Sequence, residues 1–415
     1  MKLRIFIGIF LLLSHMVFSL IPDNSQARRQ LISLLQAPIS EISSRNEQII
    51  SSPHLENSVS FEIENQNGKL YLLFINERNG KYPIVGSGNM IIRRNLDTGA
   101  IEQVKIYADD IGALIIRVRQ SGRRSLVQLS LFDDILYDKI PVEVRIEQIM
   151  TMNVSDIIER SNGRIPWEIF FPPDDLSVYG GIKDIVQEMR QIIPFLPDTE
   201  DGAMDAAGNL VRIETLGIHR LPGFNCSGFA KYVADGVYAR FGKGFMDIDS
   251  LKMKHLNLRG NKTSDAYEDT RDPYFGLDWT RNIAAEILQL QTGRHAHPED
   301  SDIRHSDFYP YREDIGYSVR DITQILYLES IRRPGMFYLG SINGEFGGNP
   351  QLWQHYHIVV LYPYFDSDGN FRITVMERNV ETSIASLEKR YPRQFIHLVG
   401  IEPEEEFSPP RLAGE

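Results

Sequence analysis

The chain has 415 residues, of which 42% are hydrophobic and 24% are charged, and its formal net charge at pH 7 is −12. This composition is ordinary for a soluble globular protein, and the length is sufficient for two or three domains. The acidic balance argues against a nucleic-acid partner, which would need a basic face, and against electrostatic adhesion to anionic lipid.

Residues 1–19 have the layout of a secretory signal peptide. Lys2 and Arg4 precede an apolar run, Ile5–Leu13, and small residues follow; cleavage is expected at the end of this segment, with a cut after Ala27 as the alternative. Removal of the two cations changes the net charge from −12 to −14. The apolar run is shorter than a comfortable membrane span, which favours cleavage over an uncleaved anchor, and no later segment is apolar enough to cross a membrane. We therefore expect an exported protein, in the periplasm, at the cell surface or secreted.

The next part of the chain predicts a linker followed by a β-rich accessory domain. Residues 20–57 are polar and contain one short helical segment, whereas residues 58–150 alternate strand-forming runs with turns such as Asn67-Gly68. The predicted strands are 59–64, 70–76, 90–94, 102–108, 113–118, 126–132 and 142–149. Short strands at this spacing favour an all-β sandwich or small barrel. No catalytic constellation occurs in it, so it is expected to bind or position a partner, or to act as a spacer.

The remainder predicts an α+β domain. A connector over 151–210 leads into a domain over 211–401, in which helical segments come first and strands follow. A large polar insertion, 242–330, includes a helix with Asp278 as its expected N-cap. The elements predicted around and after this insertion are helices 184–195, 278–290 and 383–390 and strands 335–339, 357–362, 371–378 and 395–401. The acidic tail, 402–415, is predicted to be disordered.

Cys226 is the single cysteine of the chain. Exported proteins usually carry cysteines in disulfide pairs, so an unpaired one is either buried and inert or retained for its thiol chemistry. A loop over 221–224 precedes a predicted helix over 227–238, which places Cys226 at the first helical turn. Unpaired backbone N–H groups and the helix dipole favour a thiolate there, which predicts a nucleophile. The alternative is a buried cysteine that acts as a small hydrophobe.

A cysteine nucleophile needs a base, and the base needs an orienting partner. His357 opens an apolar, β-branched strand that would hold its imidazole rigidly, and His355 is a rival because strand alternation would place it on the same face. Glu377 or Asn379, at the end of the next strand, could accept a hydrogen bond from the imidazole and fix its tautomer. The alternative for His357 is a strand-end histidine bound to a backbone carbonyl.

These residues carry a resemblance. Asn225-Cys226-Ser227-Gly228-Phe229 resembles the Asp-Cys-Ser-Gly-Phe motif of the NlpC/P60 cysteine peptidases, and the strand His357–Tyr362 resembles their His-Val-Gly-Ile-Tyr strand. The resemblance covers about residues 211–400 and implies a papain-like fold and an exported hydrolase that cuts peptide bonds of peptidoglycan, with no cofactor. It makes Cys226 the nucleophile, His357 the base and Glu377 the third residue, and it makes Asn225 and Ser227 the substrate-binding candidates. The sequence departs from the family in having Asn225 for aspartate, 131 positions between Cys226 and His357, and a charged third residue.

The mechanism implied is acyl transfer. The thiolate attacks an amide carbonyl, the Cys226 backbone N–H stabilises the oxyanion, His357 protonates the leaving amine, and water releases the acyl enzyme. Two other functions stay open: a non-catalytic envelope-binding or structural protein on a papain-like fold, and a thiol acyltransferase that transfers the acyl group to an amine.

Two further polar clusters could suggest metal sites. The acidic and histidine residues over 294–307 could be metal ligands, but their spacing fits no known site and favours a solvated polar loop. Residues 366–370 resemble the start of a calcium loop, but strand residues follow, which favours a hairpin turn. No metal is expected.

Overall fold

The computed structural model describes residues 21–51, 57–214, 223–255, 276–346, 352–403 and 407–412. The predicted signal peptide lies outside these residues. The chain divides into two compact units: Met1–Asp174 with Ser367–Asn370, and Asp175–Asp366 with Phe371–Glu415.

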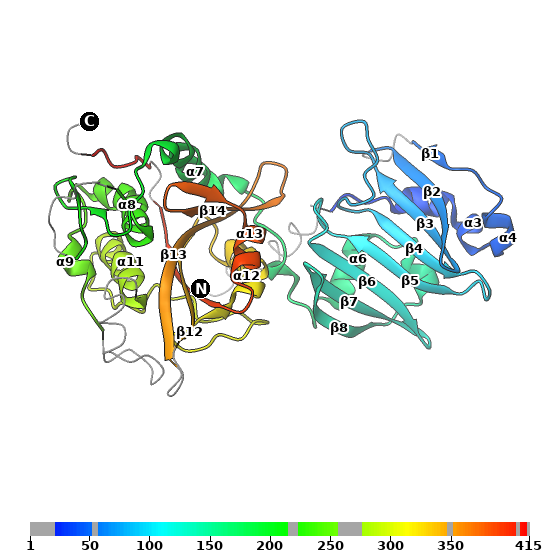
Figure 1. The fold of residues 1–415 in the computed structure, drawn as a ribbon. Helices are drawn as coiled ribbons and strands as arrows, with labels where there is room; N and C mark the ends of the chain where they lie inside the picture. Colours follow the sequence, from blue (N-terminus) through cyan, green and yellow to red (C-terminus); the bar gives the residue numbers. More distant parts are fainter. Residues whose placement is uncertain are drawn as a thin grey trace, which may run out of the picture. The chain divides into compact units, whose positions relative to one another are not determined.

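The first unit is built on one antiparallel sheet, in which eight strands follow one another in chain order (Figure 1). The strands are β1 (Gln48–Ile50), β2 (Val59–Gln66), β3 (Lys69–Asn76), β4 (Met90–Asn95), β5 (Ile101–Tyr107), β6 (Leu114–Ser121), β7 (Arg124–Leu131) and β8 (Asp134–Val142). The predicted turn Asn67-Gly68 joins β2 to β3, with both residues at positive φ, as a two-residue hairpin turn requires.

The expected all-β sandwich or small barrel was wrong. The strands lie in a single sheet, β8 is not paired with β1 among the described residues, and helices accompany the strands. Met90, Ile92 and Arg94 of β4 are buried, and Arg94 donates to two carbonyl groups at the C-terminal end of a helix rather than facing a second sheet.

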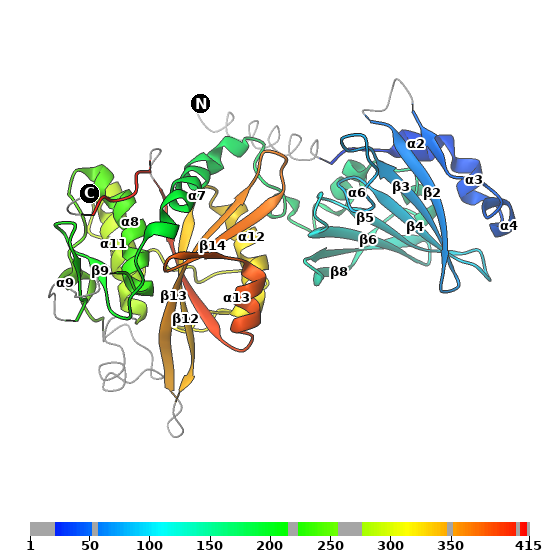
Figure 2. The same cartoon turned by 45° about the horizontal axis from the view of Figure 1, so that its top comes forward.

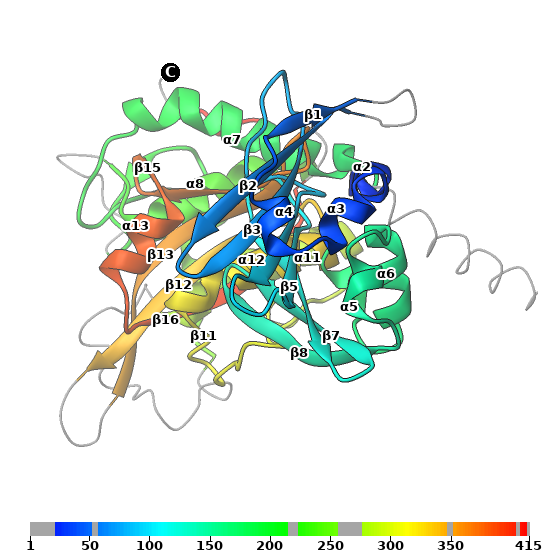
Figure 3. The same cartoon turned by 90° about the vertical axis from the view of Figure 1, so that its right-hand side faces the viewer.

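Helices α2 to α6 pack beside this sheet (Figure 3). They are α2 (Ser25–Gln30), α3 (Ile32–Gln36), α4 (Ile39–Ile42), α5 (Ile146–Ile149) and α6 (Val154–Ser161), followed by the 3-10 turn η2 (Trp167–Ile169). Arg28 of α2 is fully buried and donates to the carbonyl oxygens of Met150 and Met152, both at 3.0 Å. Burying a guanidinium is costly unless its donors are satisfied, and these bonds satisfy it. The unit therefore extends on both sides of the 58–150 segment expected for it.

The second unit combines helices with a six-stranded antiparallel sheet. Its strands lie in the order β11-β16-β12-β13-β14-β15, and two short strands, β9 and β10, pair separately. The strands are β9 (Ala203–Met204), β10 (Leu210–Val211), β11 (Tyr317–Ser318), β12 (Phe337–Phe346), β13 (Leu352–Phe365), β14 (Phe371–Glu377), β15 (Val380–Thr382) and β16 (Phe395–Ile401). The helices are α7 (Gly180–Ile192), α8 (Cys226–Tyr238), α9 (Ile248–Leu251), α11 (Leu277–Thr292), α12 (Ile322–Arg332) and α13 (Ile384–Arg390), with 3-10 turns η3 (Leu176–Tyr179), η4 (Ile193–Phe195), η5 (Ala239–Phe241) and η7 (Val319–Asp321).

The helices of this unit cover both faces of its sheet. Helices α8 and α11 lie on one side of β12 and β13, and α12 and α13 lie on the other (Figures 1 and 2). Phe229 and Val233 of α8 share a core cluster with Ile358 and Val360 of β13. On the opposite side, the ring of Tyr327 in α12 packs edge-on against other aromatic rings of the sheet. The fold is thus α+β, as expected.

One local expectation for this unit was wrong and one was confirmed. Helix α11 begins at Leu277 with Gly276 as N-cap, so Asp278 is not the cap; its carboxylate instead accepts a hydrogen bond from the His255 backbone nitrogen at 3.1 Å. Residues 366–370 join β13 to β14 as the predicted hairpin turn.

The C-terminal tail is not disordered over 407–412. Phe407 and Leu412 pack against the core cluster, and the hydroxyl of Tyr232 donates to the carbonyl oxygen of Pro410 at 2.9 Å. A Cβ atom at Gly236 of α8 would lie 2.3 Å from the Phe407 ring. The acidic composition of the tail predicted disorder, but two of its apolar side chains pack on the core of the second unit.

Candidate functional site

Cys226 is the first residue of α8, as predicted. Asn225 is the N-cap, and its side-chain oxygen accepts a hydrogen bond from the Gly228 backbone nitrogen at 2.8 Å. This bond satisfies one of the four N–H groups that a helix leaves unpaired at its start. Cys226 itself is only 2% exposed, so it is buried at the edge of the core. Because it is the first residue of α8, its thiol also lies at the partly positive end of the helix dipole.

The two expected binding residues beside the cysteine are turned inward. Ser227 is fully buried, and within the described residues its hydroxyl has no hydrogen-bond partner. Its carbonyl oxygen accepts a bond from the indole nitrogen of Trp279 at 3.1 Å. Asn225 is also buried, and its amide nitrogen donates to the carbonyl oxygen of Glu200 at 3.4 Å. The Asn225 side chain therefore fixes the start of α8, and the structure gives Ser227 no exposed surface with which to touch a substrate.

Gly228 explains why a glycine follows in this motif. A Cβ atom there would lie 2.0 Å from the carbonyl oxygen of Gly202 and 2.8 Å from the Cα atom of Ala203 in β9. Only a residue without a side chain permits this approach. The short motif around Cys226 thus encodes the seating of the helix start against a neighbouring backbone.

His357 and Glu377 meet, as predicted. Nε2 of His357 lies 2.6 Å from Oε2 of Glu377. Burial raises the pKa of Glu377, but its hydrogen bonds with His357 and Arg390 and the charges of these groups outweigh burial, so the pKa is lowered below its ordinary value. An ionised carboxylate only accepts hydrogen bonds, so the imidazole must donate from Nε2, which leaves the lone pair on Nδ1.

Arg390 is a member of this group that the sequence analysis did not identify. It is the last residue of α13, and its two terminal nitrogens contact the two carboxylate oxygens of Glu377, Nη1 to Oε2 at 3.1 Å and Nη2 to Oε1. The hydrogen bond to Glu377 raises the pKa of Arg390, so the guanidinium stays protonated. The signal was present as a basic residue at the end of the helix that follows the Glu377 strand.

A register shift in β13 places His355 and His357 on opposite faces of the sheet. His357 pairs with Ile342 and His355 pairs with Asn343, so the pairing skips Tyr356. Ile342 and Asn343 are consecutive in β12 and point to opposite faces, and therefore so do the two histidines. The expectation that they share a face was wrong because an extra residue interrupts the alternation. His357, and not His355, bonds the acidic residue, and of the two orienting candidates it is Glu377 rather than Asn379 that accepts this bond.

Tyr391 connects the histidine with the surroundings of the cysteine. Its ring centroid lies 6.0 Å from that of His357. The pKa of Tyr391 is raised, first by burial and then by electrostatic interactions with Glu377 and Cys226. The thiol and the His357–Glu377 pair therefore both lie within the electrostatic range of one phenol.

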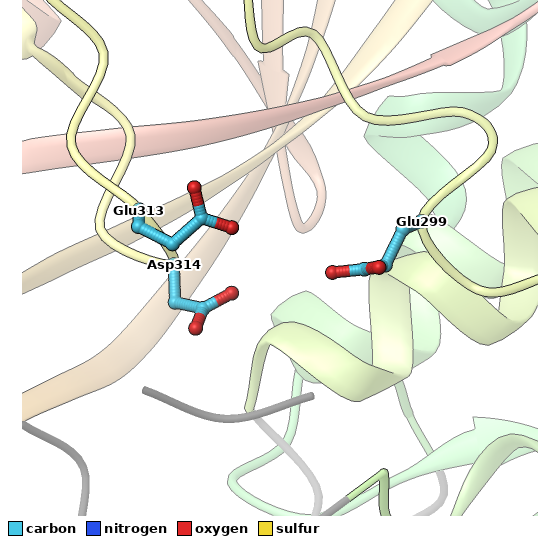
Figure 4. A group of neighbouring side chains, drawn as sticks. All are labelled: Glu299, Glu313 and Asp314. Atoms are coloured by element: carbon cyan, nitrogen blue, oxygen red, sulfur yellow. The ribbon is translucent and has the colours of Figure 1, made fainter. Parts of the chain in front are cut away.

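A separate acidic cluster includes one residue, Glu299, of the loop over 294–307 whose residues could be metal ligands. The carboxylates of Glu299, Glu313 and Asp314 come from two loops and point toward one another (Figure 4). Arginines already compensate them: Arg281 lies 3.1 Å from Asp314 and 3.7 Å from Glu299, and Arg304 lies 3.4 Å from Glu313.

Most polar residues of the loop over 294–307 are exposed, as expected, but Asp302 is not. Asp302 has a fully buried side chain, and it contacts Arg281 at 2.6 Å and Arg304 at 2.9 Å. The expectation was wrong for Asp302 because its arginine partners are brought to it by the fold. The carboxylates of Glu299, Asp302, Glu313 and Asp314 thus form an ion network with Arg281 and Arg304, and we assign no metal to them.

The fold defines an α+β chain whose second unit carries a helix-start cysteine and a histidine–carboxylate pair. A family model, the Domain of unknown function (DUF8515), matches residues 17–169, which contain the β1–β8 sheet and its helices. No curated protein and no solved structure matches the chain. Within the described part of the chain, no helix is both long enough and apolar enough to cross a membrane.

Proposed function

We propose that the chain is an exported cysteine hydrolase of the NlpC/P60 type, with a papain-like second unit that cuts peptide bonds of peptidoglycan. The observation that carries the proposal is the hydrogen bond between His357 and Glu377, in the same chain as a single cysteine at a helix start. The order of a cysteine on a helix, a histidine on a strand and a polar residue on the adjacent strand is that of the papain-like fold.

The chemistry assigns one task to each group. Cys226 supplies a thiolate, which attacks the amide carbon, and the carbonyl electrons move onto oxygen. The backbone N–H of Cys226, at the first position of α8, donates to that oxyanion. For the proton transfer, Nδ1 of His357 must reach the thiol, take its proton and deliver it to the leaving amine as the C–N bond breaks, while Glu377 holds the ring. Water then attacks the thioester, with His357 as base, and restores the thiol.

Export is part of the proposal, and the structure bears on where processing would occur. Ala27 is fully buried within α2, and Asn24 donates to the carbonyl oxygen of Gly88 and the side chain of Asn76, both at 3.1 Å. A cut after Ala27 would remove Asn24 and expose the sheet, so we expect cleavage after Ser19. Sequencing the mature N-terminus tests this, and a chain that begins at Arg28 would contradict it.

Hydrolysis of purified peptidoglycan tests the activity. The full chain is incubated with cell-wall sacculi, and released fragments are separated and weighed by mass spectrometry. We expect new peptide ends with the wild type and none with Cys226→Ser or His357→Ala, while His305→Ala, an exposed histidine of the same unit, keeps full activity. Equal release by wild type and Cys226→Ser would sink the proposal, and incorporation of an added amine would identify an acyltransferase instead.

A second function, an envelope-binding protein without turnover, is favoured by one observation. Ile358 and Val360 of β13 pack in the core cluster with Cys226, and strand alternation places His357 on the other face, beside Val359. A thiol confined to that core would react slowly. If an alkylating reagent modifies Cys226 no faster than free cysteine, the binding function replaces the enzymatic one.

A further inference from the structure

We propose that Arg390 is a positioning residue, which together with Glu377 forms a neutral unit that orients His357. The inference rests on the proposed function and deepens it. It accounts for a charged residue at a position where the NlpC/P60 family usually has a neutral one, because the arginine cancels the carboxylate charge.

The contacts leave Glu377 no freedom. Its Oε2 atom accepts bonds from Nε2 of His357 at 2.6 Å and from Nη1 of Arg390 at 3.1 Å, and its Oε1 atom contacts Nη2 of Arg390. Glu377 is 7% exposed. A planar guanidinium that meets both oxygens fixes the plane of the carboxylate as well as its position. The imidazole that bonds one of those oxygens is fixed in turn.

The local sequence brings Arg390 to this place. Ser383 caps α13 by accepting a bond from the Ser386 backbone nitrogen at 3.1 Å, and the buried Leu387 anchors the helix. The helix ends at Arg390, and Tyr391 follows directly, with the guanidinium carbon 5.3 Å from its ring centroid. One helix end thus presents both a cation and an aromatic ring to the His357–Glu377 pair.

The charge balance has a chemical consequence. A lone buried carboxylate beside an imidazole would stabilise the protonated ring and make it a poorer acid toward the leaving amine. A carboxylate paired with Arg390 still accepts the hydrogen bond from Nε2 of His357. Because the positive charge of Arg390 offsets its negative charge, it stabilises the protonated imidazole less. The Tyr391 ring also lies beside His357, and the groups that act electrostatically on this phenol include Cys226 of α8 and Arg378 in the turn after β14.

The test follows the pH dependence of two readouts in the full chain, Cys226 alkylation by iodoacetamide and peptidoglycan hydrolysis. The variants are Arg390→Gln, Arg390→Lys, Glu377→Gln, the double variant with both glutamines, and the control Lys389→Gln. The control removes an exposed cation from the same helical turn. Arg390 has a side chain that is 44% exposed, so these variants are expected to fold, which thermal unfolding checks.

The expected pattern separates charge from geometry. Arg390→Gln moves the alkaline limb of the pH profile upward by about one unit and lowers kcat about tenfold with KM unchanged, the size of one uncompensated charge nearby. Arg390→Lys keeps the limb in place but lowers kcat. The double variant, which is again neutral, returns the limb toward its wild-type position.

Two outcomes overturn the inference in distinguishable ways. A wild-type thiol whose alkylation does not depend on His357 overturns the proposed function and this inference with it. A wild-type profile that does depend on His357, but that Arg390→Gln leaves where Lys389→Gln leaves it, overturns the positioning role alone.

Discussion

Nε2 of His357 lies 2.6 Å from Oε2 of Glu377, although twenty positions separate the two residues in the chain. The hairpin formed by β13 and β14 brings them together. Val360 pairs with Met376 at one end of this hairpin, and His357 and Glu377 both lie just beyond that pair. The bond assigns the ring tautomer, and the tautomer makes Nδ1 the basic atom. The remaining features of the candidate site depend on this relationship.

Loss of the carboxylate is expected to cost activity. Glu377→Ala removes the acceptor that selects the tautomer, and we expect kcat on peptidoglycan to fall about 10²- to 10⁴-fold, the upper value being the cost of a wrong tautomer in a serine protease triad. Steady-state hydrolysis measures it. Glu381→Ala is a matched control. It removes an acidic residue of β15 whose ion-pair partner is Arg190, at 2.7 Å, and not His357. Similar rates for the two variants would show that Glu377 does not orient the base.

The same carboxylate is expected to link stability to acid pH. The pKa of Glu377 is raised by burial but more strongly lowered by His357 and Arg390, so the folded value lies below the unfolded value of about 4.3. Its stabilisation is therefore fully present above about pH 4.3 and is lost as pH falls through the folded pKa. Urea unfolding from pH 7 to 3 measures this. The stability advantage of the wild type over Glu377→Gln should shrink below about pH 4; an advantage that grows toward acid would contradict the assigned shift.

The sequence predicted the members of the site that sit in short motifs. Cys226 precedes a helix and His357 opens a strand, and both positions follow from local patterns. Arg390 was missed because its contact with Glu377 depends on where the end of α13 lies relative to β14, which local sequence does not show. His355 was placed on the wrong face because one extra residue in β13 breaks the alternation, and no local pattern marks where such a bulge falls.

The first unit shows the same limit on a larger scale. Most of its strands were predicted, because each is a local run of β-forming residues. Their pairing in chain order was not, since a meander, a sandwich and a barrel use similar strands and turns. The helices α2 and α6, which flank the strands in the sequence, join the unit through contacts such as the Arg28 bonds to Met150 and Met152, and distant contacts of this kind leave no periodic signal.

The buried ion network is expected to matter for stability. Asp302→Ala removes the shortest carboxylate contact of the buried Arg281 and leaves Asp314 and Glu299 to compensate its charge, and we expect a loss of about 1–3 kcal/mol in the free energy of unfolding. Asp307→Ala is the control, because it breaks an exposed ion pair with Arg332 and should cost at most about 1 kcal/mol. Urea denaturation compares them. Equal, small losses would mean that the Asp302 contacts are solvated in solution.

The seating of α8 offers a steric test. In Gly228→Ala the new methyl group would meet the Gly202 carbonyl oxygen at 2.0 Å, so the helix start must shift, at an expected cost of about 1–3 kcal/mol. Gly180→Ala, at the start of α7 with open space around it, should be neutral or slightly stabilising. The shift would also move Cys226, so the alkylation rate should change in Gly228→Ala alone. A stable Gly228→Ala protein with a wild-type alkylation rate would show that the approach to Gly202 is looser than the structure has it.

The tail gives the last prediction, because it contacts the same helix at a distance from the cysteine. Phe407 packs on Gly236, ten positions after Cys226 in α8. Phe407→Ala should lower the free energy of unfolding by about 1–2 kcal/mol through lost apolar burial, whereas Arg411→Ala, an exposed neighbour, should not. Since Phe407 holds the far part of the helix, the pH profile of Cys226 alkylation should stay unchanged in both variants. A Phe407→Ala protein as stable as the control would mean that the tail does not pack on α8 in solution, and a shifted alkylation profile would mean that the tail contributes to the position of the nucleophile.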